Sequence, residues 1–227
     1  TGDDPGENAA GVLLDDTDID TGGGAIDIYG LGVGDTSGVV ALSSLLDSGG
    51  GNVMIEGEGG TNDGVFFDLS EILGGGGNIT ITGNGDASGV DFYGDLDSEG
   101  GDVSITGTGG EYGVYAFMGG GLQSGGGNIV VRGEGGTEAG TSFTGEINSD
   151  GGDIEIYGVS TDAEGLTFRG GFLNGIVSAG GSIDLTGYGV TAGALLVGSG
   201  YGNNNIDSGG GLITIIGTAS AADAVGV

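Results

Sequence analysis

One phrase recurs eight times along this chain, and it restricts the fold more than any other feature. A run of two or three glycines precedes a short apolar segment and a further glycine, as in GGGNITITG, GGDVSITG and GGDIEIYG. The last glycine of each run recurs about every 27 residues. These glycines are Gly24, Gly51, Gly77, Gly101, Gly127, Gly152, Gly181 and Gly211. A fixed period of this length is typical of repeat architectures.

Each repeat contains three short apolar segments. The first alternates between apolar and polar residues, as in Ile79-x-Ile81, which predicts a half-buried β-strand. The second is seen at Val65 to Phe67 and the third near Leu96. Frequent glycine excludes helices, because each glycine costs about 1 kcal/mol in a helix. We therefore predict an all-β fold, a parallel β-helix (β-solenoid) of about eight to nine coils, with three short strands per coil of about 27 residues.

The repeats are expected to form one domain over residues 1–227, in which residues 1–10 could serve as an N-terminal arm or cap. Equivalent residues of successive coils then form columns. The glycine after the first strand is expected to turn a corner with a positive φ. Its copies are Gly30, Gly57, Gly83, Gly107, Gly133, Gly158, Gly187 and Gly217. An amide or carboxylate follows the glycine run. Stacked side-chain amides at this position are expected to hydrogen-bond from coil to coil as an Asn ladder, with a calcium column as the alternative. The ladder residues are Asn52, Asn78, Asp102, Asn128 and Asp153.

The charge balance excludes several classes of partner and chemistry. The chain has 33 acidic residues against two basic ones, a net charge of −31, and neither His nor Cys. Such a charge repels nucleic acid and acidic lipid surfaces, so we expect no nucleic-acid binding. No apolar run reaches the ~18 residues of a membrane span, so we expect no membrane insertion. Without His or Cys, the commonest general base, thiolate zinc sites and disulfides are absent.

We therefore expect a non-enzymatic protein that requires no cofactor. Any bound cation should be oxygen-liganded Ca²⁺ or Mg²⁺. The candidate weak calcium site is the densest acidic cluster, formed by Asp15, Asp16, Asp18 and Asp20.

The sequence of the repeat resembles that of a known group of proteins. GGGNITITGNGDASGVDFYG at residues 75–94, with SGGGNIVVRGEGG and GGDVSITGTGGEYGVYAF elsewhere, is similar to the repetitive β-strand regions of large bacterial surface proteins. These are proteins of the filamentous haemagglutinin and autotransporter kind, including those of cyanobacteria. The resemblance covers nearly the whole chain. It implies a right-handed β-helix that is secreted, extracellular or on the cell surface, and that serves as a fibre, sheath component or adhesin stalk.

A carbohydrate-binding or carbohydrate-cleaving β-helix, acting on surface glycans, is the alternative, because lyases and hydrolases use the same fold. Glu155 and Asp184 occupy the same outward position on adjacent coils and form a candidate acidic pair, which chance adjacency also explains. The outward tyrosines discriminate between the two functions. If they line a groove with carboxylates, a glycan site is favoured, and if they scatter, a scaffold is favoured. They are Tyr93, Tyr115, Tyr157 and Tyr188.

The two ends of the sequence predict polymerisation. The chain begins and stops within a coil, since Gly11 to Leu14 matches Ala224 to Val227. Solenoids normally cover their terminal coils with a polar or helical cap, and none is evident near the C-terminus. We expect flanking repeats of a longer chain, or head-to-tail stacking of subunits into an open filament. The expected interface residues are Val12, Leu14, Ile213, Ile215, Val225 and Val227.

Overall fold

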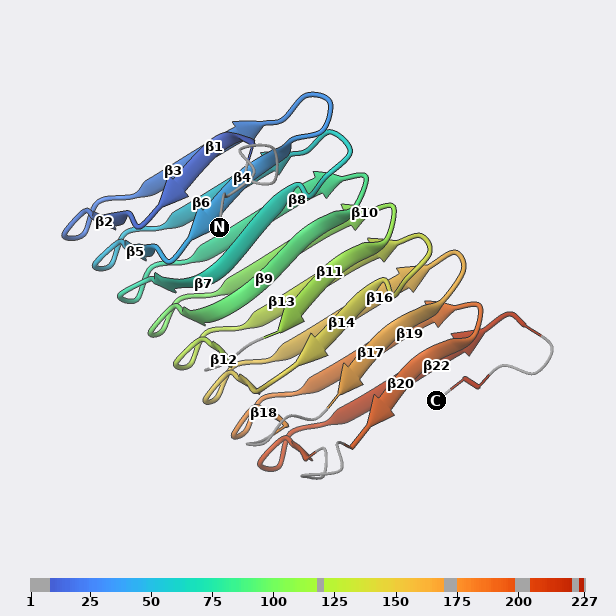
Figure 1. Cartoon of the computed structure of the whole chain (residues 1–227). Coiled ribbons are helices and arrows are strands. Elements are labelled where there is room, and N and C mark those ends of the chain that lie inside the picture. The colour runs from blue at the N-terminus through green and yellow to red at the C-terminus, as the bar shows by residue number, and fades with distance from the viewer. Residues whose placement is uncertain (1–8, 118–120, 170–174, 199–204, 222–224, 227) are drawn as a thin grey trace.

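The computed structural model describes residues 9–117, 121–169, 175–198, 205–221 and 225–226. These residues form a β-solenoid of about eight turns, in which strands of successive coils stack side by side (Figure 1). Every element in the described ranges is a strand, and every strand pair is parallel. The prediction of an all-β parallel solenoid is confirmed.

Two sheets face each other across the core. Sheet B has eight strands, one from each coil. They are β3 (Ile26–Leu31), β6 (Val53–Glu58), β8 (Ile79–Gly85), β10 (Val103–Gly109), β13 (Ile129–Gly135), β16 (Ile154–Ser160), β19 (Ile183–Gly189) and β22 (Ile213–Ala219).

Sheet A has fourteen strands and contains the second and third segments of each coil. The second segments are β1 (Ala10–Asp15), β4 (Ser37–Leu42), β7 (Val65–Leu73), β9 (Ser88–Asp97), β11 (Tyr112–Phe117), β14 (Thr141–Thr144), β17 (Glu164–Arg169) and β20 (Ala192–Val197). The separate third segments are β2 (Asp18–Asp20), β5 (Leu45–Asp47), β12 (Gly121–Gln123), β15 (Ile147–Asn148), β18 (Ile176–Val177) and β21 (Ile206–Asp207). In β7 and β9 the second and third segments run on as one strand, so these coils have two strands instead of three.

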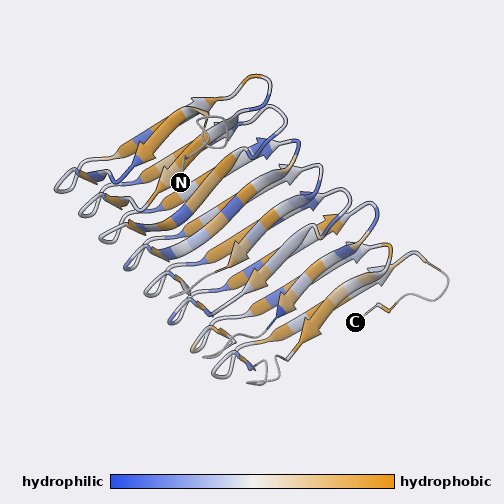
Figure 2. Cartoon of the chain, in the orientation of Figure 1, coloured by the Kyte–Doolittle hydropathy of each residue, from blue (hydrophilic) through white to orange (hydrophobic). Residues whose placement is uncertain are grey.

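The core consists of the predicted columns. Ile79 and Ile81 of β8 are fully buried, and their register partners in β6 and β10 are buried as well. Phe67 and Phe92 stack in sheet A with ring centroids 5.2 Å apart. Figure 2 shows that the hydrophobic residues follow the strands. The column pattern holds because an in-register parallel stack places equivalent residues of each coil directly above one another.

Glycine recurs in the column predicted after the first strand for a different reason from the one expected. Its members lie inside the strands of sheet B, and none has a positive φ. A Cβ on Gly107 would lie 2.0 Å from the carbonyl oxygen of Gly113 in β11, and one on Gly83 would lie 1.9 Å from that of Gly89 in β9. The two sheets therefore converge at this column, and the expectation of a corner with positive φ was wrong. Glycine is needed here for close backbone approach.

Positive φ angles are found at the opposite end of the first strand, in the glycine runs. Gly49 has φ 59° and Gly50 has φ 116°. The first of these positions also accepts Glu99 and Ala179, at φ 54° and 53°. The second is glycine in every coil, because a φ of 100° or more lies outside the region that other residues adopt easily.

A column of buried serines, which was not predicted from the sequence, stabilises these turns. Each hydroxyl donates a hydrogen bond to the carbonyl three residues later, as from Ser124 to Gly127 at 2.6 Å. Ser124 is fully buried, as is Ser149 in the next coil. The column contains Ser48, Ser98, Ser124, Ser149, Ser178 and Ser208. The serine just before six of the eight glycine runs was the available signal.

Candidate functional site

Aromatic and acidic side chains gather on the outward face of sheet A, over β7, β9 and β11. Because side chains alternate along a strand, the buried Val90 and Phe92 of β9 leave Asp91 and Tyr93 on the outer side. The strand register then forms two rows across the coils. One row contains Phe66, Asp91 and Tyr115, and the next contains Asp68, Tyr93 and Phe117. We call these six residues the aromatic–acidic face.

The rings of this face contact one another from coil to coil. Tyr93 lies at the centre, with its ring centroid 6.3 Å from Phe66, 5.8 Å from Tyr115 and 5.9 Å from Phe117. Tyr112 adds a further ring 4.9 Å from Tyr115. The rings are tilted or edge-on to each other, an arrangement that aromatic pairs prefer. A continuous aromatic strip therefore crosses three coils.

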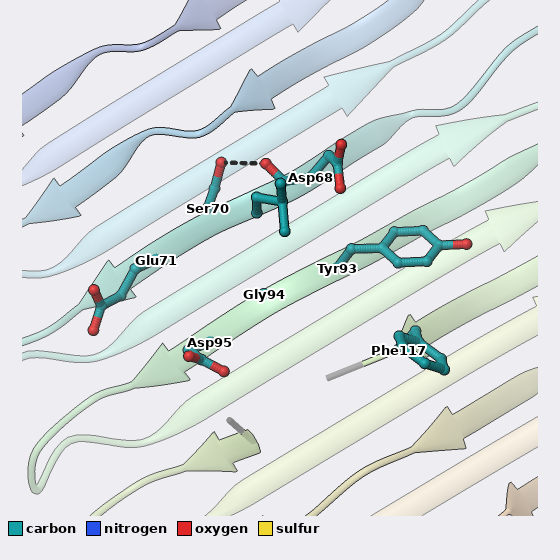
Figure 3. A pocket seen from close by; sticks show the side chains of 8 residues that line it. Asp68, Ser70, Glu71, Tyr93, Gly94, Asp95 and Phe117 are labelled. Atoms are coloured by element: carbon teal, nitrogen blue, oxygen red, sulfur yellow. Dashed lines mark hydrogen bonds between the residues drawn. The ribbon is translucent and has the colours of Figure 1, made fainter. Parts of the chain in front are cut away.

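A hollow of 390 Å³ opens beside Tyr93. Figure 3 shows Tyr93 and Phe117 toward one end, with Glu71 and Asp95 toward the other. Glu71 and Asp95 are register partners on neighbouring strands. The residues that line the hollow are Asp68, Leu69, Ser70, Glu71, Tyr93, Gly94, Asp95 and Phe117. The lining contains carboxylates and rings but no basic side chain.

Asp91 is held in an unusual environment for a carboxyl group. Its Oδ1 atom is buried and has no hydrogen-bond partner within the described part of the chain. Burial, followed by the nearby charges of Asp63 and Asp68, raises the pKa of Asp91 to about 7. Desolvation disfavours the charged form, and no basic group compensates for it. Burial and the adjacent Asp91 also raise the pKa of Tyr93.

A second hollow, of 290 Å³, lies farther along the same face. It is lined by Tyr112, Tyr115, Glu138 and Arg169, together with hydroxyl side chains of β14 and β17. The Tyr112 hydroxyl lies 3.4 Å from the Glu138 carboxylate, to which it donates a hydrogen bond. Tyr115 separates this hollow from Tyr93, so the aromatic strip extends between the two hollows.

The structure divides the four predicted tyrosines between two surfaces. Tyr93 and Tyr115 belong to the aromatic–acidic face, where they line hollows with carboxylates. Tyr157 and Tyr188 pack together at 5.8 Å on the outward side of sheet B. The contributions of Phe66, Tyr112 and Phe117 to the strip were not predicted from the sequence. The available signal was an aromatic at an outward position in three successive repeats.

The predicted acidic pair is in register but does not form an isolated dyad. Glu155 and Asp184 are partners on β16 and β19. However, Glu155 forms a salt bridge of 2.7 Å with Arg132 of β13. Both members of that salt bridge are about half exposed, so we assign it a small stabilising role.

The predicted calcium cluster lies in the first coil. Asp15, Asp16, Asp18 and Asp20 are all exposed. The Asp20 carboxylate accepts a hydrogen bond of 2.8 Å from the backbone N–H of Gly22. No group of three or more His, Cys, Asp or Glu side chains in the described ranges is arranged to hold a metal ion. Calcium binding by this cluster stays a prediction.

The Asn/Asp column links the coils as predicted, but its hydrogen bonds run from side chain to backbone, not between stacked side-chain amides. Each side-chain oxygen accepts a hydrogen bond from the backbone N–H of the equivalent residue in the next coil. The Asp102 carboxylate, for example, accepts from Asn128 at 2.8 Å, and the Asn78 side chain accepts from Asp102 at 2.9 Å. Because the position uses only an acceptor, Asn and Asp serve equally. At Asp153, hydrogen bonds from the backbone and side chain of Ser182 lower the pKa.

This ladder gives a specific prediction. Asp102→Ala should lower the free energy of unfolding by about 1 kcal/mol, because it removes one hydrogen bond between coils. Asp102→Asn keeps the acceptor and should leave stability nearly unchanged. Urea unfolding followed by circular dichroism would measure both variants. An equal loss in both would show that the charge matters, not the acceptor.

The apolar residues of the terminal coils are less covered than those inside the solenoid. Ile213 of β22 is 40 % exposed, whereas its partner Ile183 in β19 is fully buried. Val225, 56 % exposed, forms an isolated bridge with Ala192. Val12, Leu14 and Ile215 are partly buried and pack against the core. Val227 lies outside the described residues.

Together these features define the chain as a β-solenoid repeat protein. No protein-family model matches the chain, and no curated protein or solved structure matches it either. The described residues include no helix that is both long and apolar enough to span a membrane.

Proposed function

We propose that this chain is a non-enzymatic structural protein that forms part of an extracellular fibre or of the stalk of a cell-surface adhesin. The observation that carries the proposal is the pair of open solenoid ends. β22 is the last strand of sheet B at one end, and β3 is the last strand at the other. Within the described ranges neither outer strand pairs with another strand on its far side, so each presents backbone groups that a further strand could pair with.

The side chains of the end coils support the same proposal. Ile213 and Ile215 continue columns that are fully covered one coil earlier, at Ile183 and Leu185. One further coil would bury their exposed apolar surface, at about 25 cal/mol per Å². That coil could come from a second copy of this chain or from flanking repeats of a longer one. The resemblance to repetitive regions of bacterial surface proteins favours a secreted or cell-surface location.

Electron microscopy of the purified chain tests the self-stacking form of this proposal. With about eight coils at ~4.8 Å each, a filament should repeat at roughly 40 Å. The net charge of −31 opposes association, so filaments should be promoted by salt, which screens repulsion between subunits. Imaging should therefore be done at low and at high ionic strength.

A matched pair of variants identifies the interface. Ile213→Asp combined with Val225→Asp should abolish filaments, because it places charge at the exposed end of the core. Thr218→Asp adds charge at an exposed outward position of the same strand and should have little effect. Dispersed wild-type monomers at high ionic strength, or filaments with another axial repeat, would contradict head-to-tail stacking.

A further inference from the structure

We propose that the aromatic–acidic face, over β7, β9 and β11, binds neutral glycans. The apolar face of a sugar ring would stack on Tyr93 and Phe117, while carboxylates of the adjacent hollow would accept hydrogen bonds from sugar hydroxyls. This proposal concerns a lateral surface of the solenoid and does not depend on stacking at its ends.

The fold does not require aromatic residues at these positions. In the following coils the same two rows continue with Ser142 and Thr167, and with Thr144 and Arg169. The strands still pair in parallel register there. The aromatic strip is therefore a local addition to the outer surface. The Phe117 side chain is 49 % exposed. It therefore leaves apolar surface in contact with water and is not part of the core.

The hollow beside Tyr93 also presents carboxylate oxygens that can accept further hydrogen bonds. Asp68 and Glu71 line the hollow, and neither carboxylate has a hydrogen-bond or ion-pair partner among the described residues. Asp95 Oδ1 accepts one hydrogen bond, of 3.1 Å, from the backbone N–H of Gly121, which leaves its second oxygen available. Carboxylate oxygens are acceptors only, and sugar hydroxyls are donors that match them.

Charge determines the class of glycan. The hollow beside Tyr93 contains three carboxylates and no basic side chain, and the whole chain has a net charge of −31. Uronate or sulfate groups would be repelled from such a surface. A neutral polysaccharide meets no such penalty. Its length also suits a strip that crosses three coils and joins two hollows.

An organic cation is the main competing ligand, because rings and carboxylates both attract it. The geometry favours a sugar for two reasons. The rings around Tyr93 are arranged side by side along a surface, at interplanar angles of 37° to 61°, instead of enclosing a cage. One carboxyl oxygen of this face, Asp91 Oδ1, is buried and out of reach of a ligand.

Isothermal titration calorimetry with cellohexaose, laminarihexaose and mannohexaose tests the proposal. We expect at least one of these neutral hexasaccharides to bind. Tyr93→Ala and Phe117→Ala should each weaken that binding about tenfold, the factor that loss of one stacking contact produces. Tyr157→Ala removes a ring from the opposite face and is the matched control, which should bind as the wild type does. Circular dichroism and a thermal melt would verify that each variant is folded.

Several outcomes would overturn the inference. They are the absence of binding to all three sugars, an equal loss in the Tyr157→Ala control, and tighter binding of an oligoguluronate than of any neutral sugar. Displacement of the bound hexasaccharide by low concentrations of tetramethylammonium would instead indicate a cation site. Filament formation is scored separately by microscopy, so failure here leaves the structural proposal standing.

Discussion

Gly107→Ala should destabilise the solenoid by at least about 3 kcal/mol, more than a loss of helix or strand propensity could explain. A methyl group at this position would lie 2.0 Å from the carbonyl oxygen of Gly113, in the facing sheet. The clash is with backbone, so no side chain can rotate away to relieve it. The two sheets would have to separate, which would loosen the coils on either side.

The control should be a glycine that has open space around it. Gly22 has φ 58°, and a Cβ added there would have no atom within 4 Å, so Gly22→Asn should be tolerated within about 1 kcal/mol. Urea unfolding monitored by circular dichroism would compare both variants with the wild type. Equal stabilities for Gly107→Ala and the wild type would contradict the close approach of the sheets.

Asp91→Asn should stabilise the protein at neutral and alkaline pH. In the folded state the pKa of Asp91 is raised from 3.8 to about 7, so the folded protein binds a proton here more tightly than the unfolded chain does. The stabilising effect of the neutral carboxyl is therefore complete below about pH 4 and is lost as the pH rises through 7. A shift of this size corresponds to at most about 4 kcal/mol above pH 7, and the amide removes this cost.

The measurement is the free energy of unfolding of wild type and variant from pH 4 to pH 8. The difference between the two should grow with pH, because self-repulsion among the other acids affects both proteins alike. Asp27→Asn removes one charge from an exposed position of β3 and serves as the control, which should give a small difference with little dependence on pH. A constant difference between Asp91→Asn and wild type would contradict the burial of a carboxyl at this site.

The columns and the ladder could be predicted from the sequence because both depend on the period alone. Once parallel coils stack in register, Ile79 must lie above Val53 and below Val103, whatever the shape of the cross-section. The same holds for Asn78 and Asp102 in the ladder. Alternation along a strand then decides which residues face inward. The columns and the ladder can therefore be predicted from the sequence of one repeat, because the next repeat has the same pattern.

The shape of the cross-section could not be predicted in this way. The role of Gly107 depends on its distance from Gly113, and so on how closely sheet B approaches sheet A, which the period does not determine. The continuous strands β7 and β9 depend on how the chain passes between two segments that the sequence shows only as separate apolar patches. These features follow from packing between the facing sheets.

The aromatic–acidic face, too, was predictable from the sequence only in part. Alternation in the sequence was enough to place Tyr93 and Tyr115 on the outer side, because each neighbours an inward residue on its strand. The contact of Phe117 with Tyr93, the position of Tyr157 on the opposite sheet and the burial of one oxygen of Asp91 became evident only in three dimensions. Alternation determines the side of a strand on which a residue lies. Burial and contact depend in addition on which strands are neighbours in space and on the side chains that those strands carry.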